Sequence, residues 1–256
     1  MQLPPPKPPG RHHRRWKLFW LKRSGTTGFG RVAAWFACLG TQPYHRRSHL
    51  AALTQQGFVA PSASIAHPDI HLGKHVYIGD RAIVSGAVDG GSIELRDHVH
   101  LYGDLFMGTG KGGSIRIDER THVQPGCHIH AYVADIRIGS GVEIAAGCAF
   151  YSYDHGMVPG EPIMSQPLVS KGPIIVGDDV WLGHGVTVLQ NVTIGRGAVI
   201  AAGAVVVHDI PANAIAAGIP AKVIKFRDGS RPGADVVPKS PGSTPERFQK
   251  FLTPTP

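Results

Sequence analysis

The sequence has no long hydrophobic run. Its 256 residues are 42% apolar, enough for one or two domains with a buried core. No apolar stretch reaches the roughly 18 residues that a membrane-spanning helix needs. The short apolar run 32–39 lacks a convincing small-residue cleavage site after it, so a signal peptide is less favoured than a cytoplasmic basic arm. We therefore expect a cytoplasmic protein.

Cysteine is scarce. The three cysteines, Cys38, Cys127 and Cys148, match no metal-binding spacing, and nothing in their number demands an oxidising compartment. Cys127 and Cys148 both occupy a position that the repeat described below reserves for small residues. We expect these two thiols to be buried and reduced.

Acidic residues are absent from the first 68 positions, although the whole chain has a formal net charge of +8. Residues 1–57 are therefore expected to form a basic N-terminal extension, partly helical or disordered, with a Pro-rich disordered start at 1–10. Such an arm could rest on anionic lipid at the inner face of the membrane, or bind polyanions. The alternative is a solvated tail followed by a packing helix. We expect no nucleic-acid partner.

The stretch 174–211 reads as consecutive hexads. An aliphatic residue recurs every six positions, with a small or β-branched residue four places further on, and this period fits neither a helix nor a strand. Each hexad can form one short strand and a turn, so that three hexads close a triangular coil and Val176 stacks under Ile194. The residues in phase are Val176, Leu182, Val188, Ile194, Ile200 and Val206. We predict an all-β fold, a parallel β-solenoid.

The repeat begins imperfectly near Phe58 and defines a solenoid domain at 58–227. Its phase breaks at 85–94, 106–116, 135–137 and 156–175, and solenoids accept such insertions as loops at one corner, which often form the binding face. Residues 228–256 are rich in Pro, Gly and Ser and are expected to be a disordered tail.

The hexads, together with 181–183 (WLG), 201–203 (AAG), 209–211 (DIP) and 217–224 (AGIPAKVI), resemble the hexapeptide-repeat acyltransferases. The likeness is greatest to sugar O-acetyltransferases of the maltose and galactoside type. Residues 153–156 (YDHG) and 166–173 (QPLVSKGP) resemble those of surface-polysaccharide synthesis in particular. The resemblance implies a left-handed parallel β-helix, acetyl coenzyme A as acyl donor, and a homotrimer with active sites between neighbouring prisms.

His155 is the candidate general base. It ends a hexad where the regular repeat gives way to the insertion 156–175, so its ring can stand at the edge of the prism. A sugar hydroxyl attacks a thioester well only when its proton is removed, and imidazole can accept that proton near neutral pH. The resemblance places the catalytic base at this position. Asp154 could orient the ring, or could simply cap the turn.

His128, His130 and Tyr132 are candidate acceptor-binding residues. The two histidines also suggest zinc, because carbonic anhydrases of the gamma class resemble this fold and bind zinc through histidines. The Gly-His motif of that class, with a second His five residues later, is absent here. We therefore expect no metal.

The coenzyme needs a flat wall of backbone and cations at its far end. Gly183 and 201–203 offer such backbone one coil apart, and Lys222, Lys225 and Arg227 could meet phosphates; a solvated basic strand is the alternative for these lysines. The resemblance implies coenzyme contacts at a set of six positions, two of which differ in residue type from those relatives, namely His184 and His208. The six are His184, Ala202, Val207, His208, Lys222 and Lys225.

Trp181 occupies the last position of a hexad and should point outward, where it either packs in a subunit interface or lines the acyl channel. The sequence as a whole predicts an acetyl-coenzyme-A-dependent acetyltransferase acting on a sugar or oligosaccharide hydroxyl of a surface polysaccharide or its precursor. An amino sugar is an alternative acceptor. The competing classes are a zinc hydro-lyase and a non-catalytic solenoid.

Overall fold

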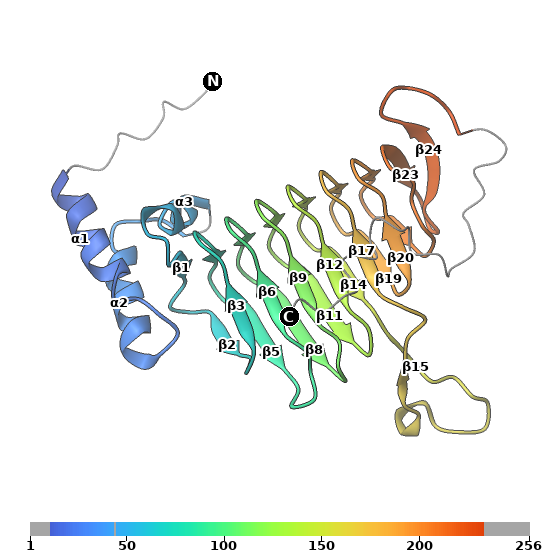
Figure 1. Cartoon of the computed structure of the whole chain (residues 1–256), viewed down its shortest axis with the longest axis horizontal. Coiled ribbons are helices and arrows are strands. Elements are labelled where there is room, and N and C mark those ends of the chain that lie inside the picture. The colour runs from blue at the N-terminus through green and yellow to red at the C-terminus, as the bar shows by residue number, and fades with distance from the viewer. Residues whose placement is uncertain (1–10, 44, 233–256) are drawn as a thin grey trace, which may run out of the picture.

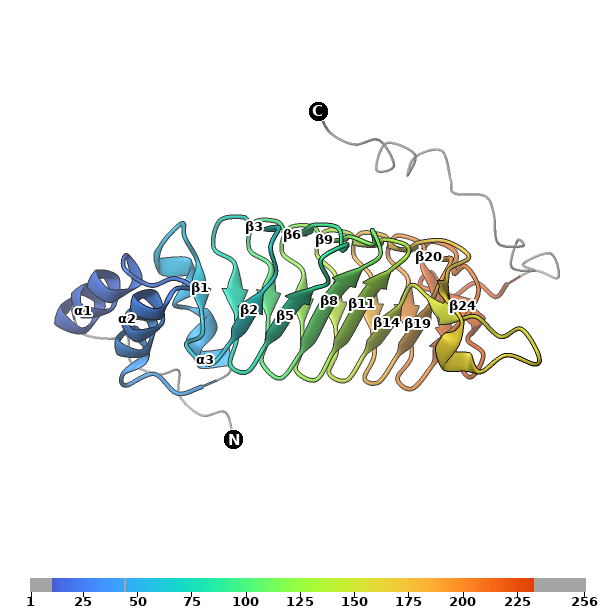
Figure 2. The same ribbon diagram turned by 90° about the horizontal axis from the view of Figure 1, so that it is seen from below.

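The chain folds as a three-sided parallel β-solenoid with helices at its N-terminal end (Figure 1; Figure 2). The structure is a computed structural model that describes residues 11–43 and 45–232. The predicted segment 1–10 and residues 233–256 of the predicted tail lie outside this part. Within residues 228–232, Asp228 accepts hydrogen bonds from the backbone and hydroxyl of Ser230 at 2.8 and 2.7 Å.

Three sheets form the sides of the prism. Sheet A has nine strands, in the order β1 (Phe58–Val59), β4 (Tyr77–Ile78), β7 (His100–Leu101), β10 (His122–Val123), β13 (Glu143–Ile144), β18 (Trp181–Leu182), β21 (Val199–Ile200), β23 (Ala214–Ala217) and β24 (Lys222–Phe226). Sheet B has seven: β2 (Ser64–Ala66), β5 (Ile83–Gly86), β8 (Phe106–Gly110), β11 (His128–Tyr132), β14 (Ala149–Tyr151), β19 (Thr187–Leu189) and β22 (Val205–Val206). Sheet C has six: β20 (Val192–Ile194), β17 (Ile174–Val176), β12 (Ile136–Ile138), β9 (Ile115–Ile117), β6 (Ile93–Leu95) and β3 (Ile70–Leu72).

The hexad prediction is confirmed by register and burial. Val176 pairs with Ile194 in parallel strands, as the predicted stacking requires. All six aliphatic residues in phase between Val176 and Val206 are at most 2% exposed. Cys127 and Cys148 are free thiols buried among them, also as predicted.

In the described residues, the longer connections between coils fall at the corner where the chain passes from sheet B to sheet C. Standard coils cross this corner in a few residues, as between β19 and β20, whereas the crossing from β14 to β17 contains an excursion. The excursion holds β15 (Asp154–His155), the 3-10 helix η2 (Ile163–Ser165) and β16 (Leu168–Val169), and it projects from the prism (Figure 1).

Two predicted breaks are shorter than the sequence suggested. Residues 106–110 continue the repeat as strand β8, in which Met107 is fully buried and pairs with Ile129. Ser85 and Gly86 likewise belong to strand β5. The glycines of these segments obscure the six-residue period in the sequence, because a glycine carries no side chain to mark the inner or outer face.

The N-terminal extension forms three helices, α1 (Arg11–Leu21), α2 (Gly28–Cys38) and α3 (His45–Ser48), followed by the 3-10 helix η1 (Ala51–Leu53). Helices α1 and α2 lie beside each other at the end of the prism (Figure 1; Figure 2). Leu21, Ala34, Ala37 and Leu50 belong to the same hydrophobic cluster as the coils, so this segment packs on the solenoid. None of the described helices is long and apolar enough to cross a membrane.

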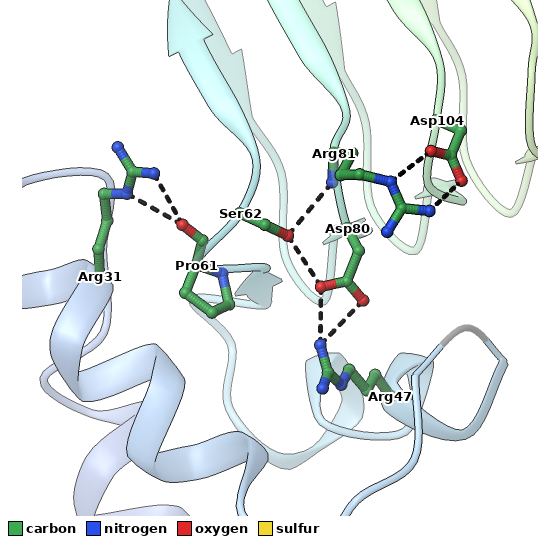
Figure 3. A network of polar contacts seen from close by, with 7 residues as sticks. All are labelled: Arg31, Arg47, Pro61, Ser62, Asp80, Arg81 and Asp104. Carbon is green, nitrogen blue, oxygen red and sulfur yellow. Dashed lines mark hydrogen bonds and ion pairs between the residues drawn. The ribbon is translucent and has the colours of Figure 1, made fainter.

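Polar contacts fasten the helices to the first coils (Figure 3). The Arg31 guanidinium of α2 donates two hydrogen bonds to the Pro61 carbonyl, at 3.0 and 2.8 Å. In α3, Arg47 donates to both carboxylate oxygens of Asp80, at 2.7 and 2.9 Å, and the Ser62 hydroxyl donates to the same carboxylate at 2.9 Å. The helical end is therefore held to the prism by both apolar and polar contacts.

Candidate functional site

Aromatic and imidazole rings line the outer face of sheet B. On strand β11, Ile129 and Ala131 are buried, so the alternating His128, His130 and Tyr132 point outward. Because β8, β11 and β14 pair in parallel, outward residues of successive coils stand beside one another. We call this set the ring row. It comprises Phe106, His128, His130, Tyr132, Tyr151 and Tyr153.

His130 lies at the centre of the ring row. Its ring stacks on Phe106 at a centroid distance of 4.8 Å and on Tyr151 at 5.0 Å. The centroid of the Tyr132 ring lies 5.1 Å from that of Tyr153, and the rings of His128 and His130 are nearly parallel, with centroids 5.9 Å apart. All three predicted acceptor residues therefore belong to one continuous surface.

Two glycines make room for these rings. A Cβ atom at Gly110 would lie 2.4 Å from Tyr132 Cε1, and one at Gly108 would lie 2.8 Å from Phe106 Cε1. The Tyr132 and Phe106 rings therefore occupy the space that side chains at Gly110 and Gly108 would need. The same glycines that obscured the repeat in the sequence shape this surface.

Burial shifts the pKa of two members of the ring row toward the neutral form, His130 and Tyr153. The pKa of His130 is lowered, mainly by its burial and also by the neighbouring His128. The pKa of the Tyr153 hydroxyl is raised, mainly by burial and further by Tyr132 and Tyr151. The rings of His130 and Tyr153 thus offer apolar faces together with neutral groups that can form hydrogen bonds.

Strand β15 carries the predicted base out of the prism. Asp154 and His155 pair in antiparallel register with Val169 and Leu168 of β16. His155 is exposed, and it follows Tyr153 of the ring row by two residues. His155 therefore lies on the excursion outside the regular coils, two residues beyond the ring row, and its role as the base stays a prediction.

Gln190, which the sequence did not single out, fixes both ends of the excursion. Its side-chain nitrogen donates a hydrogen bond to the Asp154 carboxylate, and its oxygen accepts one from the Lys171 backbone at 2.5 Å. The Asp154 carboxylate thus accepts a hydrogen bond from Gln190. The orienting role of Asp154 toward His155 stays a prediction.

A second glutamine stabilises the excursion from within. Gln166 is only 6% exposed. It accepts a hydrogen bond from the Val158 backbone at 2.7 Å and donates to the carbonyls of Val158 and Glu161 at 3.1 and 3.0 Å. These bonds give the long insertion a defined shape, although it contains little regular structure.

Three of the predicted coenzyme residues meet at the opposite corner, between sheets A and B. Gly183 donates its backbone N–H to Ile200, and Gly203 donates to the His184 carbonyl, both at 2.8 Å. A Cβ atom at Gly183 would lie 2.6 Å from the Ala202 nitrogen, so successive coils are in close backbone contact here. His184 and Ala202 are exposed on this wall.

The remaining predicted coenzyme residues lie further along the prism. Val207 and His208 follow strand β22, at the corner leading away from sheet B. Lys222 begins β24, directly after Ala221, which donates its N–H to the carbonyl of Val205 in β22 at 2.8 Å. Lys225 pairs with Ile215 at the end of sheet A.

Trp181 lies on sheet A and points outward, as predicted, with 55% of its surface exposed. It stands between Glu143 and Val199 of the adjacent strands. In the part of the chain that the structure describes, no group of three or more His, Cys, Asp or Glu side chains could hold a metal ion.

Comparison with known proteins gives a consistent result. Residues 173–208 match the family model "Bacterial transferase hexapeptide (six repeats)". A Dictyostelium discoideum protein named as an acetyltransferase is 35% identical over 145 residues, which are 52% of this chain and 75% of that relative. WbbJ of Escherichia coli K12, named for O-acetyl transfer in lipopolysaccharide biosynthesis, is 34% identical over 44% of this chain and 61% of its own length.

Among solved structures, the fold is similar to that of AntD, an N-acyltransferase from Bacillus cereus crystallised with dTDP and 3-hydroxybutyryl-CoA. The TM-score is 0.52 and the identity 20%, over 62% of this chain and 82% of AntD. The chain spans about half to three fifths of the length of several curated relatives that it matches.

Proposed function

Because this chain belongs to the hexapeptide-repeat acetyltransferases, we propose that it transfers the acetyl group of acetyl coenzyme A to a sugar hydroxyl of a surface polysaccharide or its precursor. The observation that carries this proposal is the ring row of sheet B, which runs up to the strand that bears His155. The name of the relative WbbJ supports the same class of acceptor.

The ring row suits a carbohydrate. Sugar rings present apolar C–H faces that pack on aromatic rings, and hydroxyls that need hydrogen-bonding partners at the edges. Tyr132, Tyr151 and His130 offer both. Because His130 and Tyr153 are neutral at physiological pH, the surface favours an uncharged portion of the acceptor.

In the proposed reaction, His155 removes the proton of the acceptor hydroxyl as its oxygen attacks the thioester carbonyl. The carbon–sulfur bond breaks, and the imidazolium returns its proton to the departing thiolate. Gln190, through Asp154, would hold the start of strand β15 in place during this transfer.

The coenzyme would lie along the wall of Gly183, His184 and Ala202, with Lys222 and Lys225 near its phosphates. In one chain this wall and His155 lie at different edges of sheet B. A trimer of parallel prisms, the arrangement that the sequence resemblance implies, would bring the wall of one copy toward the His155 of its neighbour.

Replacement of the proposed base tests the mechanism. His155→Ala should lower the rate of acetyl transfer to isolated surface polysaccharide about 100-fold or more, as loss of a general base typically does. Release of free coenzyme A measures the rate. Thermal stabilisation by acetyl coenzyme A should persist in the variant, because His155 is not proposed to bind the coenzyme.

The matched control is His71→Ala, since the His71 side chain is exposed on strand β3 and forms an ion pair with Asp69, at 2.7 Å. Its rate should equal that of the wild type. If His155→Ala stays within about tenfold of wild type, His155 is not the base.

A further inference from the structure

The helical end of the prism differs from an ordinary solenoid cap. Terminal units of solenoids need a polar outer face, because no further unit covers them. Helix α2 covers the prism with small residues, of which Ala33, Ala34 and Ala37 are fully buried. Its opposite side should therefore be polar, and it is not.

The outer side of α2 is apolar instead. Phe29 is 66% exposed, Val32 51%, Trp35 53% and Leu39 40%. The spacing of Phe29, Val32 and Trp35 places them on one helical face, opposite the alanines, and Leu39 follows directly after the helix. With Trp16 and Phe19 of α1, which are 44% and 48% exposed, they form what we call the cap face. Large exposed apolar patches mark interaction sites.

The two helices present this surface together. The Trp16 indole donates its N–H to the Phe36 carbonyl of α2 at 3.3 Å, and its ring lies 6.3 Å from that of Phe36. Trp20 stacks on Phe36 at 4.5 Å. The outward sides of α1 and α2 are thus joined through an aromatic contact.

Positive charge surrounds the cap face without compensation. Arg14, Arg15 and Lys22 are exposed on and just after α1, and in the described residues none of them forms an ion pair. Arg23 lies 3.8 Å from the centroid of the Phe19 ring, which holds a further cation at the surface. The sequence has no Asp or Glu before Asp69.

We propose that the cap face docks this protein on an anionic lipid bilayer. Trp and Phe side chains on an amphipathic helix bind in the headgroup region, and nearby Lys and Arg side chains are attracted to an anionic surface. A second copy of the chain is a poorer occupant, because pairing two cap faces would bring like charges together. An anionic bilayer offers an apolar interior to the Trp and Phe side chains and negative headgroups to the cations.

The docking would orient the whole molecule. Arg31 anchors α2 to Pro61, and Arg47 anchors α3 to Asp80, so the helices and prism should move as one unit (Figure 3). The helices lie at one end of the prism, whereas β23 and β24 lie at the other (Figure 1). The solenoid would therefore stand end-on to the membrane.

Vesicle flotation of the full chain tests the proposal. The protein should float with vesicles of phosphatidylglycerol and phosphatidylcholine in equal parts, and far less with phosphatidylcholine alone or at high salt. The double variant Phe29→Ser, Trp35→Ser should bind at least tenfold more weakly. The triple variant Arg14→Gln, Arg15→Gln, Lys22→Gln should lose the preference for phosphatidylglycerol.

Val88→Ser provides the matched control, because Val88 is fully exposed on the loop between β5 and β6, away from the cap face. This variant should bind as the wild type does, and circular dichroism should show all variants folded. Equal flotation of wild type and the Phe29, Trp35 variant would overturn the proposal. So would concentration-dependent self-association that this variant abolishes, if the wild type does not float with phosphatidylglycerol.

Discussion

Gly110 controls the position of the Tyr132 ring. The ring lies over the glycine so closely that an added Cβ atom would meet it at 2.4 Å. The ring must therefore rotate or lift if the site carries any side chain, and its contact with Tyr153 at 5.1 Å would be lost. A single methyl group can thus alter one end of the ring row.

Gly110→Ala should raise the KM for the polysaccharide acceptor several-fold and change the KM for acetyl coenzyme A little, because only the acceptor is proposed to contact Tyr132. Steady-state kinetics with each substrate varied in turn would measure both values. Tyr132→Ala should produce the same pattern. A larger effect on the coenzyme would contradict the assignment of this face to the acceptor.

At the scale of the element, the Arg47–Asp80 pair links helix α3 to the corner after strand β4. The Arg47 and Asp80 side chains are only 19% and 12% exposed. The nearby pair of Arg81 and Asp104 is more exposed, at 58% and 38% (Figure 3). Water screens the second pair and reaches the first one poorly.

The two pairs should therefore respond differently to the same change. Asp80→Asn should lower the free energy of unfolding by about 3 kcal/mol, since it leaves the poorly hydrated Arg47 without its carboxylate. Asp104→Asn should cost about 1 kcal/mol or less. Urea unfolding followed by circular dichroism would compare them. Equal losses would mean that burial does not set the strength of the Arg47 contact.

The elements also show how far the sequence predicts this fold. The hexads from Val176 to Val206 could be predicted residue by residue, because each inward position must fit a narrow prism and the period repeats without interruption. Strand β8 could not be predicted in this way, because Gly108 and Gly110 lie where outward side chains would mark the repeat.

For the candidate site, the sequence predicted His155 and the three ring-row residues His128, His130 and Tyr132. It did not single out Phe106, Tyr151 or Gln190 as site residues. Phe106 was assigned to a break, and Gln190 meets Asp154 across 36 positions of chain. Such a contact depends on the path of the excursion, which has no repeat from which to infer it.

At the scale of the whole molecule, the half-buried His100 makes stability depend on pH. Its ring packs against Tyr77 and His122, at 5.8 and 4.9 Å. Burial, aided by His122 and His98, lowers the pKa of His100 to about 4. The unfolded chain, with a histidine pKa of about 6.5, binds a proton at higher pH than the folded chain does.

Because the unfolded chain binds this proton more readily, acid destabilises the folded chain. The contribution of His100 to stability is fully present above about pH 6.5 and is lost as the pH falls toward 4, since protons then favour the unfolded chain. The melting temperature should therefore fall across this window. In His100→Gln the fall should be smaller, because the amide does not titrate. An identical pH profile in wild type and variant would contradict the role of His100.

The spacing of the strands also sets the distance between the helical end of the solenoid and the strand that bears His155. Sheet B passes from β2 to β14 in four steps, each of about 4.8 Å, so strand β14 lies about 19 Å beyond the first coil. The helices add a layer of roughly 10 Å. An enzyme standing on its cap face would thus hold the root of the His155 strand about 30 Å above the lipid. A monosaccharide attached directly to a lipid headgroup would fall short of it, whereas a chain of several sugars could reach. The number of coils would then select acceptors by length.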